Sequence, residues 1–164
     1  MIAVRTLGTA IVVLALLSTS AVADWSYYDK KDEMRGDVFT FAAATSDNKV
    51  NFEFPYEGGS NLSIVVRKRN DKLDAIMFSI SKGQFTCGIR NCKGAVRFDK
   101  NGKPGTIEEL TLALPQDYSH DVLFAVNENW FYKRLRSSDA LTIELPFYQS
   151  GNLQFKFSLN RLDF

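Results

Sequence analysis

A single histidine limits the catalytic chemistry that this chain can carry. His120 is the only histidine in the sequence, so metal sites built on two or three histidines are excluded, and a Ser-His-Asp triad would have to use this residue. It stands in the polar run 117–121, but residues adjacent in sequence rarely reach triad geometry, and the chain has no G-x-S-x-G motif. The pattern is typical of a histidine on a surface loop.

The acidic residues do not form a recognisable catalytic or metal-binding set. The run 99–105 begins like a calcium loop, but Lys103 and Pro104 stand where an EF-hand needs an oxygen ligand and a glycine. Glu108 and Glu109 are adjacent, and neighbours on a strand point to opposite faces, so they cannot act together as acid and base. The sequence therefore predicts a turn at 99–105 and indicates no catalytic residue, metal ligand or cofactor.

The two cysteines are spaced for a local disulfide. Cys87 and Cys92 enclose a short run in which Gly88 and Asn91 allow the chain to turn back on itself. Redox-active pairs are usually C-x-x-C near a helix start, so this spacing predicts a structural bond. Loop-closure entropy for so short a ring is worth about 2 kcal/mol. We expect a Cys87–Cys92 clip formed in an oxidising compartment.

A basic run has the composition of a partner-binding surface. Arg67, Lys68 and Arg69 follow one another at the end of an expected strand, where they can meet an acidic partner. Asp71 and Asp74 come soon afterwards, and neutralisation of the basic run within the protein is the competing interpretation.

Three consecutive aromatic residues form a second candidate surface. Phe131 and Leu135 are spaced to face the core from an expected helix, so Trp130 or Tyr132 should be partly exposed, where aromatic side chains favour contacts. Packing against the edge of the sheet explains these aromatics equally well. The candidate partner-binding residues are therefore Arg67, Lys68, Arg69, Trp130 and Tyr132.

The elements that must position these residues are mostly strands, because apolar and polar residues alternate with period two along most of the chain. Leu62, Ile64 and Val66 share one face of such a run, whereas only 129–137 has helical spacing. The pattern predicts a mainly β single domain, an antiparallel β-sandwich or partly open barrel with one short helix. The expected strands are 25–28, 38–44, 51–54, 62–68, 75–80, 84–87, 93–98, 106–114, 122–126, 140–145 and 153–159.

Three details of this prediction concern strand ends and pairing. The runs 84–87 and 93–98 flank the cysteines and are expected to form a hairpin. The strands before Pro55 and Pro146 are expected to end at those prolines, because proline cannot donate to a strand ladder.

The N-terminal residues have the layout of an export signal. Arg5 precedes the apolar run 7–17, which is too short to span a membrane, and small residues follow up to Ala23. We expect cleavage after Ala23, which leaves 24–164 as one periplasmic or secreted domain without a membrane span. An uncleaved anchor is the competing interpretation.

The charge balance excludes one class of partner. Arg5 is the only charged residue in 1–23, so its removal lowers the Lys and Arg count from 20 to 19, equal to the 19 Asp and Glu. Nucleic-acid-binding domains usually carry a basic excess, so we expect no nucleic acid partner. The aromatic share of 13% is enough to build a core.

Short runs along most of the chain carry a resemblance to known proteins. They are Asp24-Trp25, Lys82–Cys87, Cys92 with Val96–Asp99, Glu144–Tyr148 and Phe155–Phe157. Together they resemble a loose group of small exported bacterial proteins, many of them uncharacterised. The C-terminal runs are also similar to periplasmic accessory proteins associated with type VI secretion. The resemblance implies an envelope location and a β-rich fold, and it includes no catalytic motif.

These observations favour a non-enzymatic function. We expect an exported binding or inhibitory module that acts on another envelope or secreted protein, and the sequence indicates no oligomeric state. One alternative is an accessory subunit of a secretion system or of the envelope. Another is an envelope glycan hydrolase that uses carboxylates alone, which requires two carboxyl groups about 5 to 10 Å apart across a cleft.

Overall fold

The computed structural model describes residues 25–164, so the expected signal segment 1–23 lies outside the described residues. One helix, α1 (Glu128–Arg136), lies between β7 and β8. The strands are β1 (Ser26–Lys31), β2 (Val38–Thr45), β3 (Leu62–Arg69), β4 (Lys72–Ile80), β5 (Cys92–Asp99), β6 (Ile107–Ala113), β7 (Val122–Ala125), β8 (Ala140–Phe147) and β9 (Gly151–Ser158).

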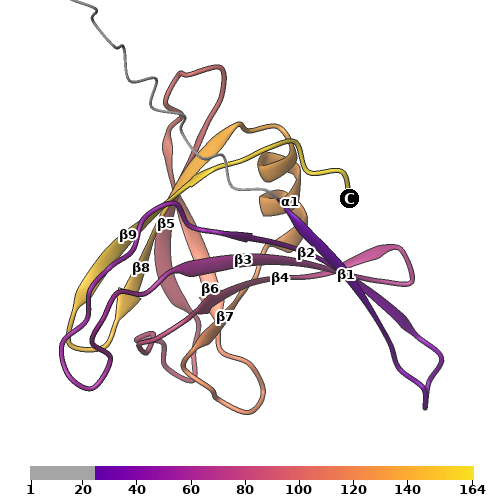
Figure 1. Cartoon of the computed structure of the whole chain (residues 1–164), viewed down its shortest axis with the longest axis horizontal. Coiled ribbons are helices and arrows are strands. Elements are labelled where there is room, and N and C mark those ends of the chain that lie inside the picture. The colour runs from indigo at the N-terminus through magenta and orange to yellow at the C-terminus, as the bar shows by residue number, and fades with distance from the viewer. Residues whose placement is uncertain (1–24) are drawn as a thin grey trace, which may run out of the picture.

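All the strands belong to one open sheet. Their order is β1-β2-β3-β4-β7-β6-β5-β8-β9, and every pairing is antiparallel. The sheet is strongly bent: in Figure 1, β2, β3 and β4 run across the view, whereas β5, β8 and β9 cross them at a steep angle. The prediction of a mainly β antiparallel fold with one short helix is confirmed.

Alternating side chains fill the inner face of this bent sheet. Leu62, Ile64 and Val66 of β3 are fully buried, and so are Phe155 and Phe157 on β9. Residues from both halves of the sheet belong to one core cluster. The expected inner faces of these strands are therefore confirmed, and apolar burial on the bent sheet supplies the main stabilisation of the fold.

Helix α1 packs against both halves of the sheet. The ring of Phe131 lies 5.3 Å from the ring of Phe78 in β4 and 5.3 Å from that of Phe98 in β5, in edge-on arrangements. Leu135, one turn later, is buried as well. The inward face expected for this helix is confirmed, and edge-to-face ring contacts add to its area burial.

The outer edge of β9 is covered by the turn that follows β2. The Oδ1 atom of Asn48 accepts the N–H of Lys156 at 2.7 Å, and its Nδ2 donates to the carbonyl of Gln154 at 3.0 Å. The Oδ2 atom of Asp47 accepts the N–H of Ser158 at 2.7 Å, and the N–H of Asp47 donates to the carbonyl of Lys156 at 2.8 Å. This turn therefore links the last strand of the sheet to a strand near its other end.

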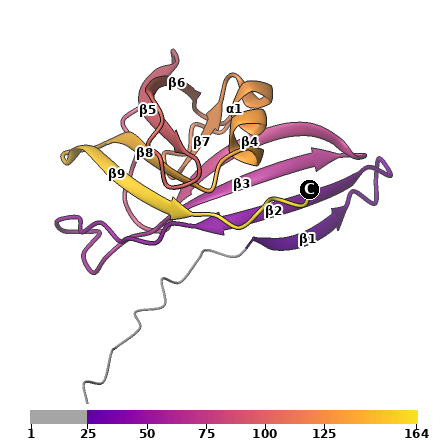
Figure 2. The ribbon, with the colours of Figure 1, turned by 90° about the horizontal axis from the view of Figure 1, so that it is seen from above.

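The C-terminal segment continues the same closure. Figure 2 shows that it runs from β9 alongside β2 and β1. The indole Nε1 of Trp25 donates to the carbonyl of Asn160 at 3.1 Å, and the N–H of Asp163 donates to the hydroxyl of Tyr27 at 3.3 Å. Leu162 is buried in the core cluster, so this segment is part of the folded unit.

The expected hairpin between 84–87 and 93–98 is wrong. Strand β5 has β6 on one side and β8 on the other, so neither of its edges is free to take a third strand. The segment containing Phe85 instead crosses to β8, where Phe85 forms an isolated bridge with Phe147.

The two expectations about prolines also differ from the structure. Strand β8 continues through Pro146, because its ladder with β5 ends at Glu144 and only the carbonyl of Pro146 is used on that side, where it accepts the N–H of Thr86. The run 51–54 forms no strand. Phe52 still inserts into the core, so its alternation with the exposed Phe54 reflects side-chain packing without a backbone ladder.

A glycine in β5 provides a test of the pairing between β5 and β8. A Cβ atom at Gly94 would lie 2.7 Å from the carbonyl oxygen of Glu144 and 3.0 Å from Cδ2 of Leu145. We expect Gly94→Ala to lower the free energy of unfolding by about 1 to 3 kcal/mol, because the strands must separate to admit the methyl group. Gly88→Ala is the matched control, since a Cβ at Gly88 meets nothing within 4 Å. Urea denaturation measures both; equal stability of the two variants would contradict the close approach.

Candidate functional site

The strand order sorts the connections into two ends of the sheet. We call the first the loop end; it contains the connections 46–61, 81–91, 114–121 and 148–150. The other is the helix end, which contains α1 and the connections 32–37, 70–71 and 100–106. The candidate residues from the sequence lie mainly at the helix end, whereas the exposed aromatic side chains described below lie at the loop end.

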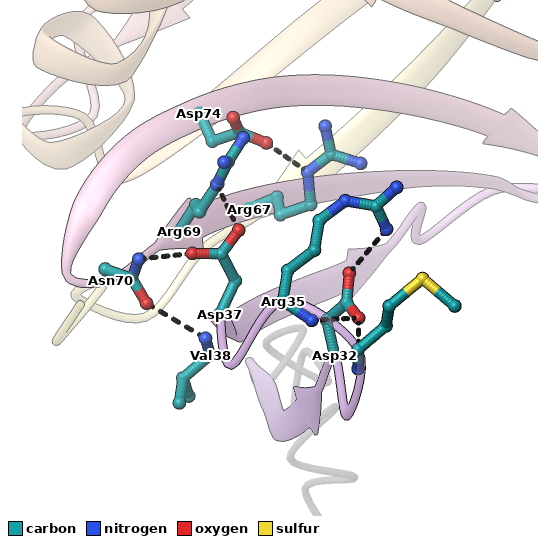
Figure 3. A network of polar contacts seen from close by, with 9 residues as sticks. Asp32, Arg35, Asp37, Val38, Arg67, Arg69, Asn70 and Asp74 are labelled. Carbon is teal, nitrogen blue, oxygen red and sulfur yellow. Dashed lines mark hydrogen bonds and ion pairs between the residues drawn. The ribbon is translucent and has the colours of Figure 1, made fainter.

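The basic run meets carboxylates from its own chain, as Figure 3 shows. Arg67 Nε lies 2.5 Å from Oδ2 of Asp74, and Arg69 Nε lies 2.9 Å from Oδ2 of Asp37. Asn70 Nδ2 donates to the other oxygen of Asp37 at 2.7 Å. Two of the three basic side chains are therefore ion-paired within the protein. Asp74 neutralises Arg67, as the competing interpretation expected, whereas Asp71 forms no ion pair with the basic run.

A neighbouring carboxylate shapes the turn between β1 and β2. Asp32 Oδ1 accepts the N–H groups of Met34 and Arg35, and Oδ2 accepts a bond from the Arg35 guanidinium at 3.1 Å (Figure 3). The backbone N–H and then the side chain of Arg35 hold the pKa of Asp32 below its usual value. This carboxylate therefore stabilises the turn between β1 and β2.

The remaining candidate side chains contact the C-terminal residue or the core. Lys68 Nζ lies 4.6 Å from the ring centre of Phe164, and the hydroxyl of Tyr132 donates to the backbone oxygen of Phe164. Trp130 is half-buried, with its ring 5.9 Å from that of Phe98. All five candidates thus have contacts within the protein, and partner binding by them stays a prediction.

The acidic candidates also have partners within the chain. Glu108 pairs with Arg134 of α1, whereas Glu109 pairs with Lys93 at 2.6 Å. Asp99 accepts two bonds from Arg97 and one from the N–H of Gly105 at 3.1 Å, which hold its pKa below the usual value, the Arg97 bond contributing most. Residues 25–164 contain no group of three His, Cys, Asp or Glu side chains that could hold a metal ion.

The cysteines form the expected bond at the loop end. The sulfur atoms of Cys87 and Cys92 lie 2.09 Å apart, and the Cα atoms are 5.1 Å apart. The turn between them presents Ile89, which is 89% exposed. The structure therefore confirms the clip and shows that it carries an apolar side chain into solvent.

One segment holds the connections of the loop end together; we call residues 81–87 the strap. The N–H of Phe85 donates to the carbonyl of His120 at 2.7 Å, and Nδ1 of His120 lies 3.1 Å from the carbonyl of Phe85. On its other side, the backbone N–H of Thr86 donates to the carbonyl of Pro146 at 2.9 Å, and the backbone N–H of Tyr148 donates to the carbonyl of Gln84 at 2.9 Å. His120 is thus a loop residue that positions the strap.

A buried serine fixes the start of the strap. Ser60 is fully buried, and its Oγ donates to the carbonyl of Lys82 at 2.7 Å while accepting the N–H of Lys82 at 2.9 Å. The same hydroxyl lies 3.0 Å from Oγ of Ser81. A buried polar group with these partners is satisfied, so the bond network ties the connection 46–61 to the strap.

A layer of aromatic rings supports the strap from below. The ring of Phe147 lies 4.8 Å from that of Phe85 and 5.2 Å from that of Phe52. Gly83 has a φ of 110°, and a Cβ there would lie 2.8 Å from the Phe52 ring. This close approach at a positive φ requires glycine, so the strap lies directly on the aromatic layer.

Large apolar side chains project into solvent from the loops around the strap. Phe54 is 82% exposed, and Tyr118 and Tyr148 are each 58% exposed. A small cavity of about 140 Å³ lies between the run 52–56 and the turn 148–150. Sequence reasoning missed this surface because it treated 51–54 as a strand; the run Phe-Glu-Phe-Pro-Tyr between polar residues was the available signal.

No family model, curated protein or solved structure matches the chain. The resemblance to small exported bacterial proteins therefore stays an expectation from the sequence.

The contacts of Asp99 predict how the helix end responds to acid. Because its pKa is lowered in the folded protein, its stabilising contribution is present above the ordinary value of 3.8 and is lost as the pH falls through the folded value. We expect Asp99→Asn to cost on the order of 1 kcal/mol at pH 7 and progressively less below pH of about 4.

Urea denaturation at several pH values measures this difference. Asp163→Asn is the matched control, because the pair that Asp163 forms with Arg161 is 3.8 Å long and exposed. A constant difference between wild type and Asp99→Asn at every pH would contradict the role of the carboxylate charge.

Proposed function

We propose that this protein is an exported, disulfide-bonded binding module that contacts a protein partner through its loop end. The observation that carries the proposal is the projection of Phe54, Ile89, Tyr118 and Tyr148 from four connections that flank or include one strap. Exposed aromatic residues in a group are characteristic of interface centres.

These exposed side chains are not needed to stabilise the fold. Phe54 follows the buried Phe52, so the local chain already has its core anchor without it. Tyrosine and phenylalanine provide large contact area with few rotatable bonds, which limits the entropy lost on binding. Because the strap bonds hold the loops in place, less ordering is needed when a partner docks.

The expected export agrees with the chemistry of the described residues. The Cys87–Cys92 bond is of the kind that persists in an oxidising compartment. No helix within residues 25–164 is long and apolar enough to cross a membrane. An envelope or secreted protein is therefore the proposed partner, and the module would act as an inhibitor where the loop end covers the partner's own site.

One observation favours a second candidate function, that of an accessory subunit in an assembly. Strand β1 is the first strand of the sheet, all six of its residues are exposed, and it pairs with a strand only on the β2 side. An edge strand of this kind can pair with a strand of another chain.

Export predicts a defined mature N-terminus. When the full chain is produced with its own N-terminal segment in a bacterial host, we expect the protein isolated from the periplasm to begin at Asp24. Intact-mass analysis and N-terminal sequencing measure this. Retention of residues 1–23 on a membrane-bound product would contradict cleavage and favour the anchor interpretation.

The loop-end proposal predicts which substitutions abolish partner capture. We expect Phe54→Ala and Tyr148→Ala each to weaken capture of a specific partner from an envelope extract by about tenfold or more, as for interface hot spots. Ile107→Ala is the matched control, because Ile107 is 77% exposed but lies on β6 at the helix end. Quantitative pull-down with the oxidised protein measures all three variants.

Two outcomes of this experiment would overturn the proposal. Capture that survives both loop-end substitutions but is lost in Arg67→Ala would place the interface at the basic run. Capture that is lost only when β1 pairing is blocked, for example by Tyr28→Pro, would favour the accessory subunit.

A further inference from the structure

The cavity at the loop end has the size of one side chain. Its volume is about 140 Å³, and it lies between the run 52–56, Gln84 of the strap and the turn 148–150. Sites for drug-sized ligands usually measure about 300 to 1,000 Å³, so this cavity is too small for such a ligand. It suits a single anchoring group from a larger molecule.

The lining of the cavity combines aromatic rings with one negative charge. Phe52, Phe54, Tyr56 and Tyr148 contribute rings, and Glu53 is the only charged residue among the lining side chains. Ring faces carry negative electrostatic potential and attract cations within about 6 Å of the ring centre. Both features therefore favour a positively charged group.

Glu53 differs from the carboxylates that pair with arginines at the helix end. Asp37, Asp74 and Glu108 each pair with an arginine of the chain. Within residues 25–164, the Glu53 carboxylate forms neither an ion pair nor a hydrogen bond. The nearby Lys82 does not compensate it, because Lys82 lines the adjacent depression and its Nζ donates to the carbonyl of Glu57 at 3.0 Å.

We propose that this cavity receives an arginine side chain of the protein partner, an assignment that rests on the proposed function. A guanidinium is planar, so it stacks on aromatic faces while its N–H groups reach a carboxylate in a fork. An apolar side chain in the same place would remove Glu53 from water without a compensating partner, which is unfavourable. Gln84 also lines the cavity.

The cavity walls are fixed before any ligand arrives. The N–H of Tyr56 donates to the carbonyl of Glu53 at 3.0 Å, which closes a turn within the run 52–56. The backbone N–H of Tyr148 donates to the carbonyl of Gln84 at 2.9 Å, which holds the opposite wall to the strap. An arginine side chain therefore meets preformed walls, so its binding does not have to offset the entropy lost when loops become ordered.

Small probes test the cavity without the partner. We would titrate the oxidised, isotope-labelled protein with Nα-acetyl-L-arginine amide and follow backbone amide shifts by NMR. Saturable shifts confined to residues 52–56, 84 and 148–150 are expected. Nα-acetyl-L-leucine amide and tetramethylammonium serve as the apolar and the compact cationic probes, and both should bind more weakly than the arginine probe.

Variants identify the groups responsible. We expect Glu53→Gln to weaken arginine-probe binding by about tenfold. Glu57→Gln is the matched control and should leave it unchanged, because Glu57 stands on the same connection without lining the cavity. Tyr148→Phe should retain binding and Tyr148→Leu should weaken it, since only the ring is required.

Each contrary result overturns the assignment. The proposal of an arginine anchor would be wrong if the leucine probe bound more tightly than the arginine probe. It would also be wrong if Glu53→Gln bound the arginine probe as tightly as the wild type. Tighter binding of tetramethylammonium would assign the cavity to a small quaternary ammonium ligand. No shift with any probe at saturating concentration would show that the cavity takes no single group. If the probe fails while Phe54→Ala still abolishes partner capture, the proposed function stands without this inference.

Discussion

Asp47 and Asn48 bridge β2 and β9 with side-chain and backbone hydrogen bonds, and the remainder of the structure depends on this bridge. A single open sheet has two free edges, and an unpaired edge leaves N–H and C=O groups that another chain can use. The bridge pairs the backbone groups of Gln154, Lys156 and Ser158 on the β9 edge and ties this edge to the turn after β2. Only the bent sheet has a common interior, in which Phe131 can touch both β4 and β5. The bent sheet therefore underlies both the common core and the separation of the two ends.

The two ends use charge in opposite ways. At the helix end, Arg67, Arg69 and Arg134 meet carboxylates of the same chain, so these three cations are already paired. Exposed ion pairs of this kind contribute little to stability, but they orient the turns that close the strands. At the loop end, Glu53 has no such partner in the described part of the chain and stands beside exposed rings. Arg67 and Arg69 of the basic run are thus compensated within residues 25–164, whereas Glu53 is not.

Local patterns predicted the elements, whereas long-range pairing decided the site. Period-two alternation located β3 and β9, and the spacing of Phe131 and Leu135 located the buried face of α1, since these patterns reflect burial directly. Alternation could not show that β5 already has two neighbours, so the segment around Phe85 was predicted to pair with it. The aromatic surface arises from connections distant in sequence, and their proximity depends on the bonds of the strap. Neither composition nor periodicity contains that information.

The disulfide lies at the end of the strap, a segment that is not part of a continuous strand ladder. The strap is held by separate hydrogen bonds to Ser60, Asn61, His120, Pro146 and Tyr148 and by the isolated bridge of Phe85. It therefore lacks the continuous ladder that protects a strand from local opening. A ring as short as that closed by Cys87 and Cys92 adds only about 2 kcal/mol to global stability. Its larger effect is local, because Cys87 is the last residue of the strap and is buried in the core. The bond holds the strap at its last residue and thereby preserves the geometry of the loop end.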